Sequence, residues 1–367
     1  MTLTSAAKLL ALAAAIAASL ALPYVVGSFL LGTATLVLIY GLFAMSVNIM
    51  AGYAGLVSLG QAGIMACSAY GAAYVANHRG GYAAQVIVGM GCCLAVTALF
   101  AVMAMRTSGV YFLMVTLAQG IIVFGLATSL EPVTGGANGL TGVYRPPFVA
   151  QDWQFYYLCV AVLLVCAGLM WVFINSPFGL ALRGLRESES RLRMLGYNTT
   201  LHKFYGFVVS GLFAGIAGLL FAYNNQYVSP SVSEFAVSAQ AVLMIILGGI
   251  ATLPGPLIGA LIIVLAQNWL SLHTDRWPTV EGLVFVFVVL FAREGIVGVV
   301  AKAWRRHVPG PSSEIRQAEP AVLPAGVAAA AEGRDQGRPA STDRPTGERG
   351  GRSEVPGGLR GTQGGSG

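Results

Sequence analysis

The residues of this chain best suited to chemistry are seven charged side chains gathered between positions 183 and 203. By contrast, residues 9–78, 107–130 and 204–233 contain no Asp, Glu, Lys or Arg. Charged groups are costly to place in an apolar environment, so a cluster of this kind must face water. The chemistry that it offers is ion pairing and hydrogen bonding, and we expect it to contact an aqueous partner.

The local pattern predicts that the charged segment is a short amphipathic helix. Asn175-Ser-Pro177 combines a capping side chain with proline at the first helical position, and Gly196 is a typical stop. Pairs 187–191 and 189–193 place an acid four residues before a base, each worth a few tenths of a kcal/mol. Leu185 lies on an apolar edge with two further leucines. A loop that only fixes topology would need bases alone, so we favour docking on another protein. The loop spans residues 175–203, and its expected docking residues are Arg183, Arg186, Glu187, Glu189, Arg191, Leu192, Leu195 and Gly196.

Composition predicts an all-α polytopic membrane protein. The chain is 56% hydrophobic and 10% charged, whereas soluble domains carry about 25% charge. The apolar segments predict about ten transmembrane helices, at residues 9–31, 33–50, 56–76, 82–105, 107–130, 153–174, 204–222, 236–251, 256–272 and 277–292. Basic residues concentrate on one side when both termini are cytoplasmic, which favours an N-in/C-in arrangement. We expect residues 1–308 to form the membrane domain and the Gly/Pro-rich residues 309–367 a disordered cytoplasmic tail.

Several alternative classes are disfavoured by the same residues. The net charge of +6 lies in loops and the tail, which fits membrane topology better than nucleic-acid binding. The N-terminus resembles a secretory signal, but its apolar run continues to Leu31, which suits a retained helix. The five cysteines lie in apolar runs and are expected to be buried rather than paired. The four histidines lack metal spacing, so no metal or cofactor is expected.

Two pairs of apolar segments are separated by unusually short Gly/Pro-containing interruptions. The expected helix breaks are Gly52 and Gly55 in the first pair, and Gly248, Gly249, Pro254 and Gly255 in the second. Short interrupted segments at corresponding places in two halves are typical of broken or re-entrant helices around a transport pathway. Ordinary tight turns between antiparallel helices would give the same pattern, and both interpretations stay open.

Several segments in chain order resemble the branched-chain amino acid (Liv-type) ABC transporter permeases. Residues 176–196 are similar to the cytoplasmic coupling loop of that family. Residues 48–62 resemble its Gly-Tyr-x-Gly-x-x-Ser-x-Gly segment, and residues 106–118 its Arg-x-x-Gly-x-Tyr-Phe-x-x-x-Thr-Leu-Ala stretch. Residues 134–139, 213–218 and 247–260 also fit. Two departures are Gln61, where many members carry His, and the tail beyond residue 308.

The resemblance implies a permease subunit of an ABC importer in the bacterial inner membrane. Its substrates would be branched-chain amino acids delivered by a periplasmic binding protein, with urea or short-chain amides as the alternative. The implied partners are ATP-binding cassette ATPase subunits, which grip the coupling loop, and a second homologous permease subunit in a heterodimer. The chain has three lysines and no phosphate-binding loop, so we expect no enzyme activity of its own.

Isolated polar residues in the apolar segments could line the pathway. Those in the family-like segments are the candidates: Asn48, Tyr53, Ser58, Gln61 and Thr116. Gln119, Ser210, Gln240, Gln267 and Asn268 are similarly isolated. Intramembrane polar groups often bond neighbouring helices together at about 1 kcal/mol each, which is the alternative role for any one of them. Ionisable groups at membrane depth are nearly absent, and this disfavours an ion-coupled secondary transporter.

Overall fold

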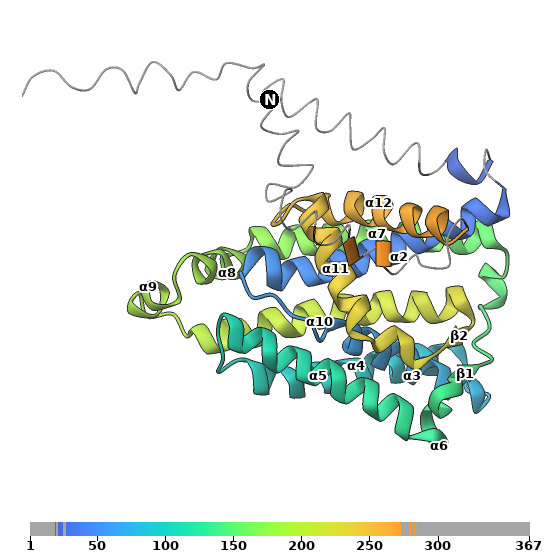
Figure 1. The fold of residues 1–367 in the computed structure, drawn as a ribbon, viewed down its shortest axis with the longest axis horizontal. Helices are drawn as coiled ribbons and strands as arrows, with labels where there is room; N and C mark the ends of the chain where they lie inside the picture. Colours follow the sequence, from blue (N-terminus) through green and yellow to red (C-terminus); the bar gives the residue numbers. More distant parts are fainter. Residues whose placement is uncertain are drawn as a thin grey trace, which may run out of the picture. The chain divides into compact units, whose positions relative to one another are not determined.

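The computed structural model describes residues 19, 21–24, 27–272, 279, 280, 282, 283 and 286. Its regular structure is almost entirely helical (Figure 1). The principal helices are α2 (Ser28–Asn48), α3 (Gln61–Asn77), α4 (Tyr82–Ala104), α5 (Val110–Ser129), α7 (Asp152–Asn175), α8 (Pro177–Glu187), α9 (Glu189–Met194), α10 (Thr199–Asn225), α11 (Phe235–Gly248) and α12 (Gly255–Ser271). Shorter elements are η1 (Ile49–Tyr53), α6 (Glu131–Thr134), η2 (Gly136–Asn138), η3 (Pro147–Val149), η4 (Pro230–Ser233) and the strands β1 (Leu140–Thr141) and β2 (Tyr227–Val228).

The helical membrane fold predicted from composition is confirmed in this coarse form. Among the described residues, five helices are long and apolar enough to cross a membrane, and α11 and α12 are shorter apolar helices. At about 1.5 Å per residue, the 14 residues of α11 span less than the ~30 Å hydrocarbon core. The total of ten spans stays a prediction, since segments 9–31 and 277–292 and the tail lie largely or wholly outside the described residues.

The first interruption lies between α2 and α3. Helix α2 continues into the π-helical turn η1, and the chain then runs without helical structure from residue 54 to residue 60. Gly55 has a φ of +72°, a conformation that glycine adopts without steric cost. The helix predicted to begin at residue 56 therefore begins at Gln61. The predicted helix began too early because it was based on apolarity alone, and Leu56 and Val57 are apolar whether the segment is helical or extended.

The second interruption separates α11 from α12. Gly249 has a φ of +123° and Ala251 a φ of +61°, so the chain leaves helical geometry directly after α11. A Cβ at Gly248 would lie 1.8 Å from the carbonyl oxygen of Gly255. The turn is thus compact enough that only glycine fits at that position.

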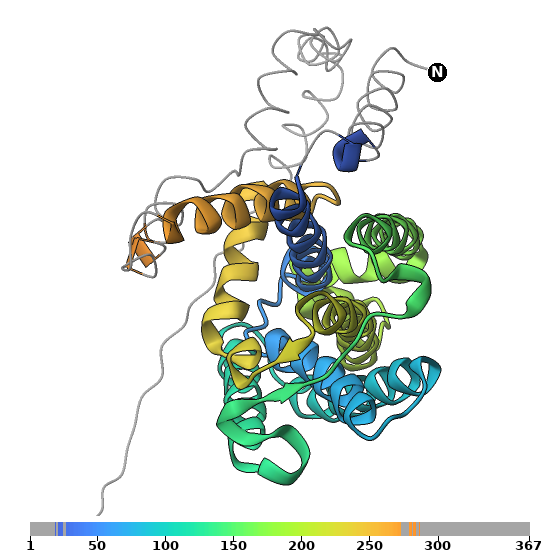
Figure 2. The same ribbon diagram turned by 90° about the vertical axis from the view of Figure 1, so that its right-hand side faces the viewer.

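Helix α2 lies in the interior of the bundle. It packs against α7, α10, α11 and α12, and Figure 2 shows α11 and α12 on one side of it and α7 on the other. Its side chains Ile39, Leu42 and Phe43 are fully buried. Helix α10 packs on α2, α3 and α4. Because α10 begins at the charged loop and ends beside the β1–β2 ribbon, the ribbon and the loop mark opposite ends of the bundle (Figure 1).

Candidate functional site

The charged segment folds as two helices rather than one. Ser188 is extended, with φ −166° and ψ 110°, and its hydroxyl accepts a 3.3 Å hydrogen bond from the backbone N–H of Arg191. Serine is a strong N-cap, and here it ends α8 and starts α9. The prediction of a single helix up to Gly196 is wrong for this reason. Glu187 consequently lies on α8, and within the described structure it forms no ion pair with Arg191.

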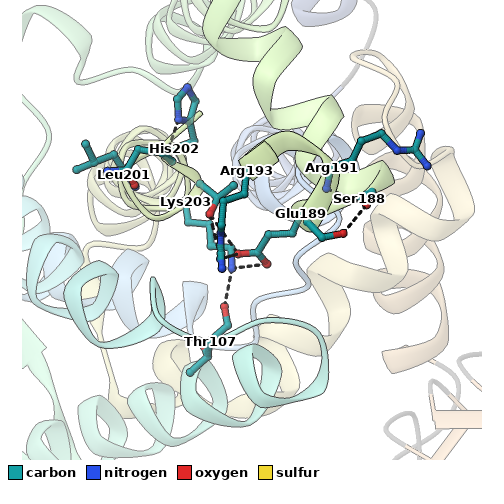
Figure 3. Close-up of polar contacts among 11 residues, drawn as sticks. Thr107, Ser188, Glu189, Arg191, Arg193, Leu201, His202 and Lys203 are labelled. Carbon is teal, nitrogen blue, oxygen red and sulfur yellow. Dashed lines mark hydrogen bonds and ion pairs between the residues drawn. The ribbon is translucent and has the colours of Figure 1, made fainter. Parts of the chain in front are cut away.

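Glu189 is the centre of a polar cluster that holds α9 against the bundle (Figure 3). One carboxylate oxygen accepts hydrogen bonds from Arg193 (3.1 Å) and the Thr199 hydroxyl (3.3 Å). The other accepts a 2.8 Å hydrogen bond from the ammonium of Lys203, which also donates to the carbonyl oxygen of Thr107 at 3.0 Å. These contacts tie α9 to the start of α10 and to the α4–α5 turn. We call this set the Glu189 cluster.

Lys203 is the charged member of this cluster that the sequence analysis did not pair with Glu189. Only 3% of its side chain is exposed, whereas Arg193, the partner predicted for Glu189, is 68% exposed. Exposed pairs contribute little, but a buried ammonium left without its partner is strongly destabilising. Partial burial alone would raise the pKa of the Glu189 carboxyl. The Lys203, Thr199 and Arg193 contacts outweigh that effect and lower this pKa below its ordinary value of 4.5.

The leucines predicted to share one apolar edge separate into two environments. Leu185 and Leu192 are buried, whereas Leu195 is 71% exposed and its neighbour Met194 is 82% exposed. Tyr197 is also exposed. Gly196 turns the chain here with a φ of +86°, and its N–H donates to the carbonyl oxygen of Arg193. Met194, Leu195 and Tyr197 therefore form an exposed apolar tip beyond the Glu189 cluster.

Helix α8 is hydrogen-bonded to the first helix break. The Arg186 guanidinium donates a 2.7 Å hydrogen bond to the carbonyl oxygen of Gly52. The guanidinium of Arg183 lies over the Tyr53 ring, 5.5 Å from its centroid. A Cβ at Gly55 would lie 2.7 Å from the Cγ of Arg186, so the chain can approach α8 this closely only as glycine. A pocket of about 560 Å³ at this contact is lined by Gly52, Tyr53, Arg183, Arg186, Glu187 and Ala251.

Asn48 joins the two breaks to each other. Its amide nitrogen donates to the carbonyl oxygen of Thr252 at 2.8 Å, and its amide oxygen accepts from the N–H of Ala251 at 3.1 Å. A Cβ at Gly52 would lie 2.1 Å from that amide oxygen and 2.8 Å from the Ala251 nitrogen. Helix α8, residues 48–55 and residues 251–252 thus meet through hydrogen bonds. We call the contacts of Arg186, Gly52, Asn48 and Thr252 the break junction.

The other pathway candidates are buried, and two of them bond to neighbouring segments. The Gln61 amide donates to the Ser210 hydroxyl at 3.0 Å, and Ser210 donates to the Ser46 carbonyl oxygen at 2.7 Å. The Thr116 hydroxyl accepts from the Leu59 N–H at 3.2 Å. Ser58 is fully buried, and its hydroxyl has no partner within the described structure. A pathway role for Ser58, Gln61 and Thr116 stays a prediction, whereas the geometry of Gln61 and Thr116 supports bonding between neighbouring segments.

The described residues contain no cluster of three or more His, Cys, Asp or Glu side chains that could hold a metal ion. The five cysteines are unpaired thiols, and three of them are buried as expected. Cys92 is instead exposed on the outer side of α4, and Cys67 is partly exposed. Neither position supports a disulfide within the described part of the chain.

Comparison with known proteins gives the family. A sequence profile described as branched-chain amino acid transport system / permease component matches residues 29–293. The high-affinity branched-chain amino acid transport system permease protein LivM of Escherichia coli K12 is 28% identical over 322 residues, covering 78% of this chain and 74% of LivM. LivM of Salmonella typhimurium is also 28% identical, over 76% of this chain and 72% of that protein. LivH of Escherichia coli K12 is 31% identical over 35% of this chain and 42% of LivH. The profile covers most of the chain, which therefore belongs to the family of branched-chain amino acid transport system permease components.

Proposed function

We propose that this chain is a membrane-spanning permease subunit of an ABC importer for branched-chain amino acids in the bacterial inner membrane. Membership of the permease family supports the class, and the names of the LivM and LivH relatives support the substrate. The observation that carries the proposal is the exposed apolar tip held by the Glu189 cluster. It is an anchored surface at the end of the bundle that carries the charged loop.

The partner that fits this surface is a separate ATPase subunit. Exposed Met194 and Leu195 offer apolar contact area, and the exposed guanidinium of Arg191 offers a charged rim. Protein interfaces combine an apolar centre with a polar rim in this way. The Glu189 cluster would hold α9 rigid, so that movement of the ATPase displaces the loop as a unit instead of bending it.

The break junction supplies a route from the docked loop into the membrane domain. Arg186 is hydrogen-bonded to the backbone of residue 52, and Asn48 links the same segment to residues 251–252. A displacement of α8 would therefore move both interrupted helices together. Interrupted helices are suited to alternating access because their ends can shift without breaking a continuous helix.

The remaining partners follow from this arrangement. The loop end of the bundle would be cytoplasmic, with both chain termini on the same side. A periplasmic binding protein would deliver substrate at the β1–β2 end. A second homologous permease subunit would complete a heterodimer, with residues 1–308 as the membrane domain and 309–367 as a cytoplasmic tail.

Co-purification of the ATPase subunit with this chain tests the docking role. Leu195→Asp places a charge in the apolar tip and is expected to reduce the recovered ATPase about tenfold or more, because buried interface anchors carry most of the binding energy. Leu130→Asp is the matched control, since Leu130 is an exposed leucine directly after α5, at the end of the bundle opposite the charged loop. Full recovery of the ATPase with the Leu195 variant would overturn the docking role.

A further inference from the structure

A cavity of about 580 Å³ lies at the end of the bundle opposite the charged loop, where α2, α10, α11 and α12 meet. Its position follows from its lining, which includes Asn225 at the end of α10 and Ser271 at the end of α12. Small-molecule sites commonly have volumes of about 300–1,000 Å³. The cavity is therefore large enough for a small metabolite.

The polar part of the lining carries a negative charge. Among the described residues that line the cavity, Glu234 is the one charged residue, and no described lysine, arginine or histidine accompanies it. The carboxylate makes no capping hydrogen bond to α11, although Glu234 is the residue directly before that helix. A carboxylate without a basic neighbour in the lining favours a ligand that brings its own cationic group, such as an ammonium.

Besides Asn225, three amide side chains lie on the polar side of the cavity. Gln240 comes from α11, and Gln267 and Asn268 come from α12. Each was an isolated polar residue in an apolar segment of the sequence, and the fold brings all three to one cavity. An amide offers two N–H donors and a carbonyl acceptor, which allows it to bind a carboxylate without adding charge. The Asn268 amide also donates a 3.4 Å hydrogen bond to the Thr33 hydroxyl, which fixes its position.

The rest of the lining is aliphatic and aromatic. Leu36, Val237, Val264 and Phe221 offer apolar surface on the same cavity. A branched aliphatic side chain gains free energy in proportion to the apolar area it removes from water, about 25 cal/mol per Å². Urea or a short amide has no ammonium for Glu234 and little apolar surface for these residues, so it fits the lining less well.

We infer that this cavity receives a zwitterionic aliphatic α-amino acid on its way into the membrane domain. Glu234 pairs with the ammonium, the amides of Gln267 and Asn268 donate to the carboxylate, and Val237 and Val264 contact the branched side chain. The inference rests on the proposed function and adds to it the residues that accept the substrate. It also places the recognition site away from Gln61, the residue that stands where many members of the family carry His.

Uptake of radiolabelled leucine by cells that depend on this permease is the first test. Glu234→Gln removes the charge with little change in size and is expected to lower the maximal uptake rate about tenfold or more, the loss typical of one charged hydrogen-bond partner. Glu131→Gln is the matched control, because Glu131 lies at the same end of the bundle, in α6, outside the cavity lining. Membrane abundance is measured for each variant.

A second measurement detects occupancy directly. Val237→Cys is introduced into the purified permease–ATPase complex, and its modification by a maleimide is followed by peptide mass. Leucine at millimolar concentration should slow this modification at least threefold, whereas 4-methylpentanoate, which lacks the ammonium, should not. In the Glu234→Gln background the protection by leucine should disappear.

The outcomes distinguish failure of the proposed function from failure of the cavity assignment. If the unsubstituted permease does not take up leucine, the proposed function fails. If it takes up leucine, but Glu234→Gln transports normally or leucine gives no protection at position 237, the cavity assignment is wrong and the proposed function stands.

Discussion

Arg186 donates a hydrogen bond to the carbonyl oxygen of Gly52, a residue 134 positions earlier in the chain. This contact joins the charged helix α8 to the point where α2 loses its helical hydrogen bonding. Asn48 continues the connection to residues 251 and 252. Two interruptions that are far apart in sequence are thus parts of one hydrogen-bonded structure, and the charged loop is attached to it.

Replacing Arg186 should uncouple ATP hydrolysis from transport. Arg186→Gln removes the charged donor to Gly52, and we expect amino acid uptake to fall about tenfold or more while the assembled complex still hydrolyses ATP. Uptake and ATPase activity are measured on the same reconstituted complex. Arg79→Gln is the control, because Arg79 is exposed in the turn between α3 and α4 and lies outside both the break junction and the docking surface. Parallel loss of both activities would point to failed assembly instead of uncoupling and would contradict this role.

Adding one methyl group at Gly52 should destabilise the fold. A Cβ there would lie 2.1 Å from the Asn48 amide oxygen, so Gly52→Ala must break the link between the two interruptions. Overpacking of this kind typically costs about 1–3 kcal/mol. Gly125→Ala is a matched control, because no atom lies within 4 Å of a Cβ built at Gly125. Thermal unfolding of the purified chain in detergent compares the two, and equal midpoints would show that the junction is not constrained.

The sequence predicted what depends on composition and local pattern. Within residues 27–272, the uncharged segments correspond to helices, and the capping residues Ser176 and Gly196 flank the charged helices α8 and α9. Contacts across long sequence separations could not be read in the same way. Lys203 looks like a topology-setting base until the fold buries it beside Glu189, and Ser188 looks like a helical residue until its hydroxyl caps α9.

The polar candidates show the same limit. Family-like motifs directed attention to Asn48, Gln61 and Thr116, but the fold bonds these side chains between neighbouring segments. Gln240 and Gln267 lack such a motif, yet they line a cavity. Helical periodicity indicates which residues share a helix face, but which faces meet around a cavity depends on tertiary packing.

Substitution of Gln61 distinguishes the two roles. Gln61→Leu removes the hydrogen bond to Ser210, and we expect lower thermal stability by about 1 kcal/mol with the preference among amino acids unchanged. Gln267→Leu, in the cavity, should instead reduce transport of leucine. Competition between leucine, isoleucine, valine and urea for uptake measures the preference. A changed preference in the Gln61 variant would restore that residue to the pathway.

The Glu189 cluster should make the stability of the loop depend on acidic pH. The pKa of Glu189 lies below 4.5 in the folded chain, so its charged form is favoured by folding. Its contribution is therefore complete above the unfolded value and is lost as the pH falls through the lower folded value. The difference in thermal stability between the unsubstituted chain and Glu189→Gln should be constant from about pH 8 to about pH 5.5 and shrink below pH 4.5. Glu187→Gln, whose carboxylate is outside the cluster, serves as the control for removal of a carboxylate from the same loop. A difference that disappears between pH 6 and pH 8 would mean that the Glu189–Lys203 pair does not hold α9 in place.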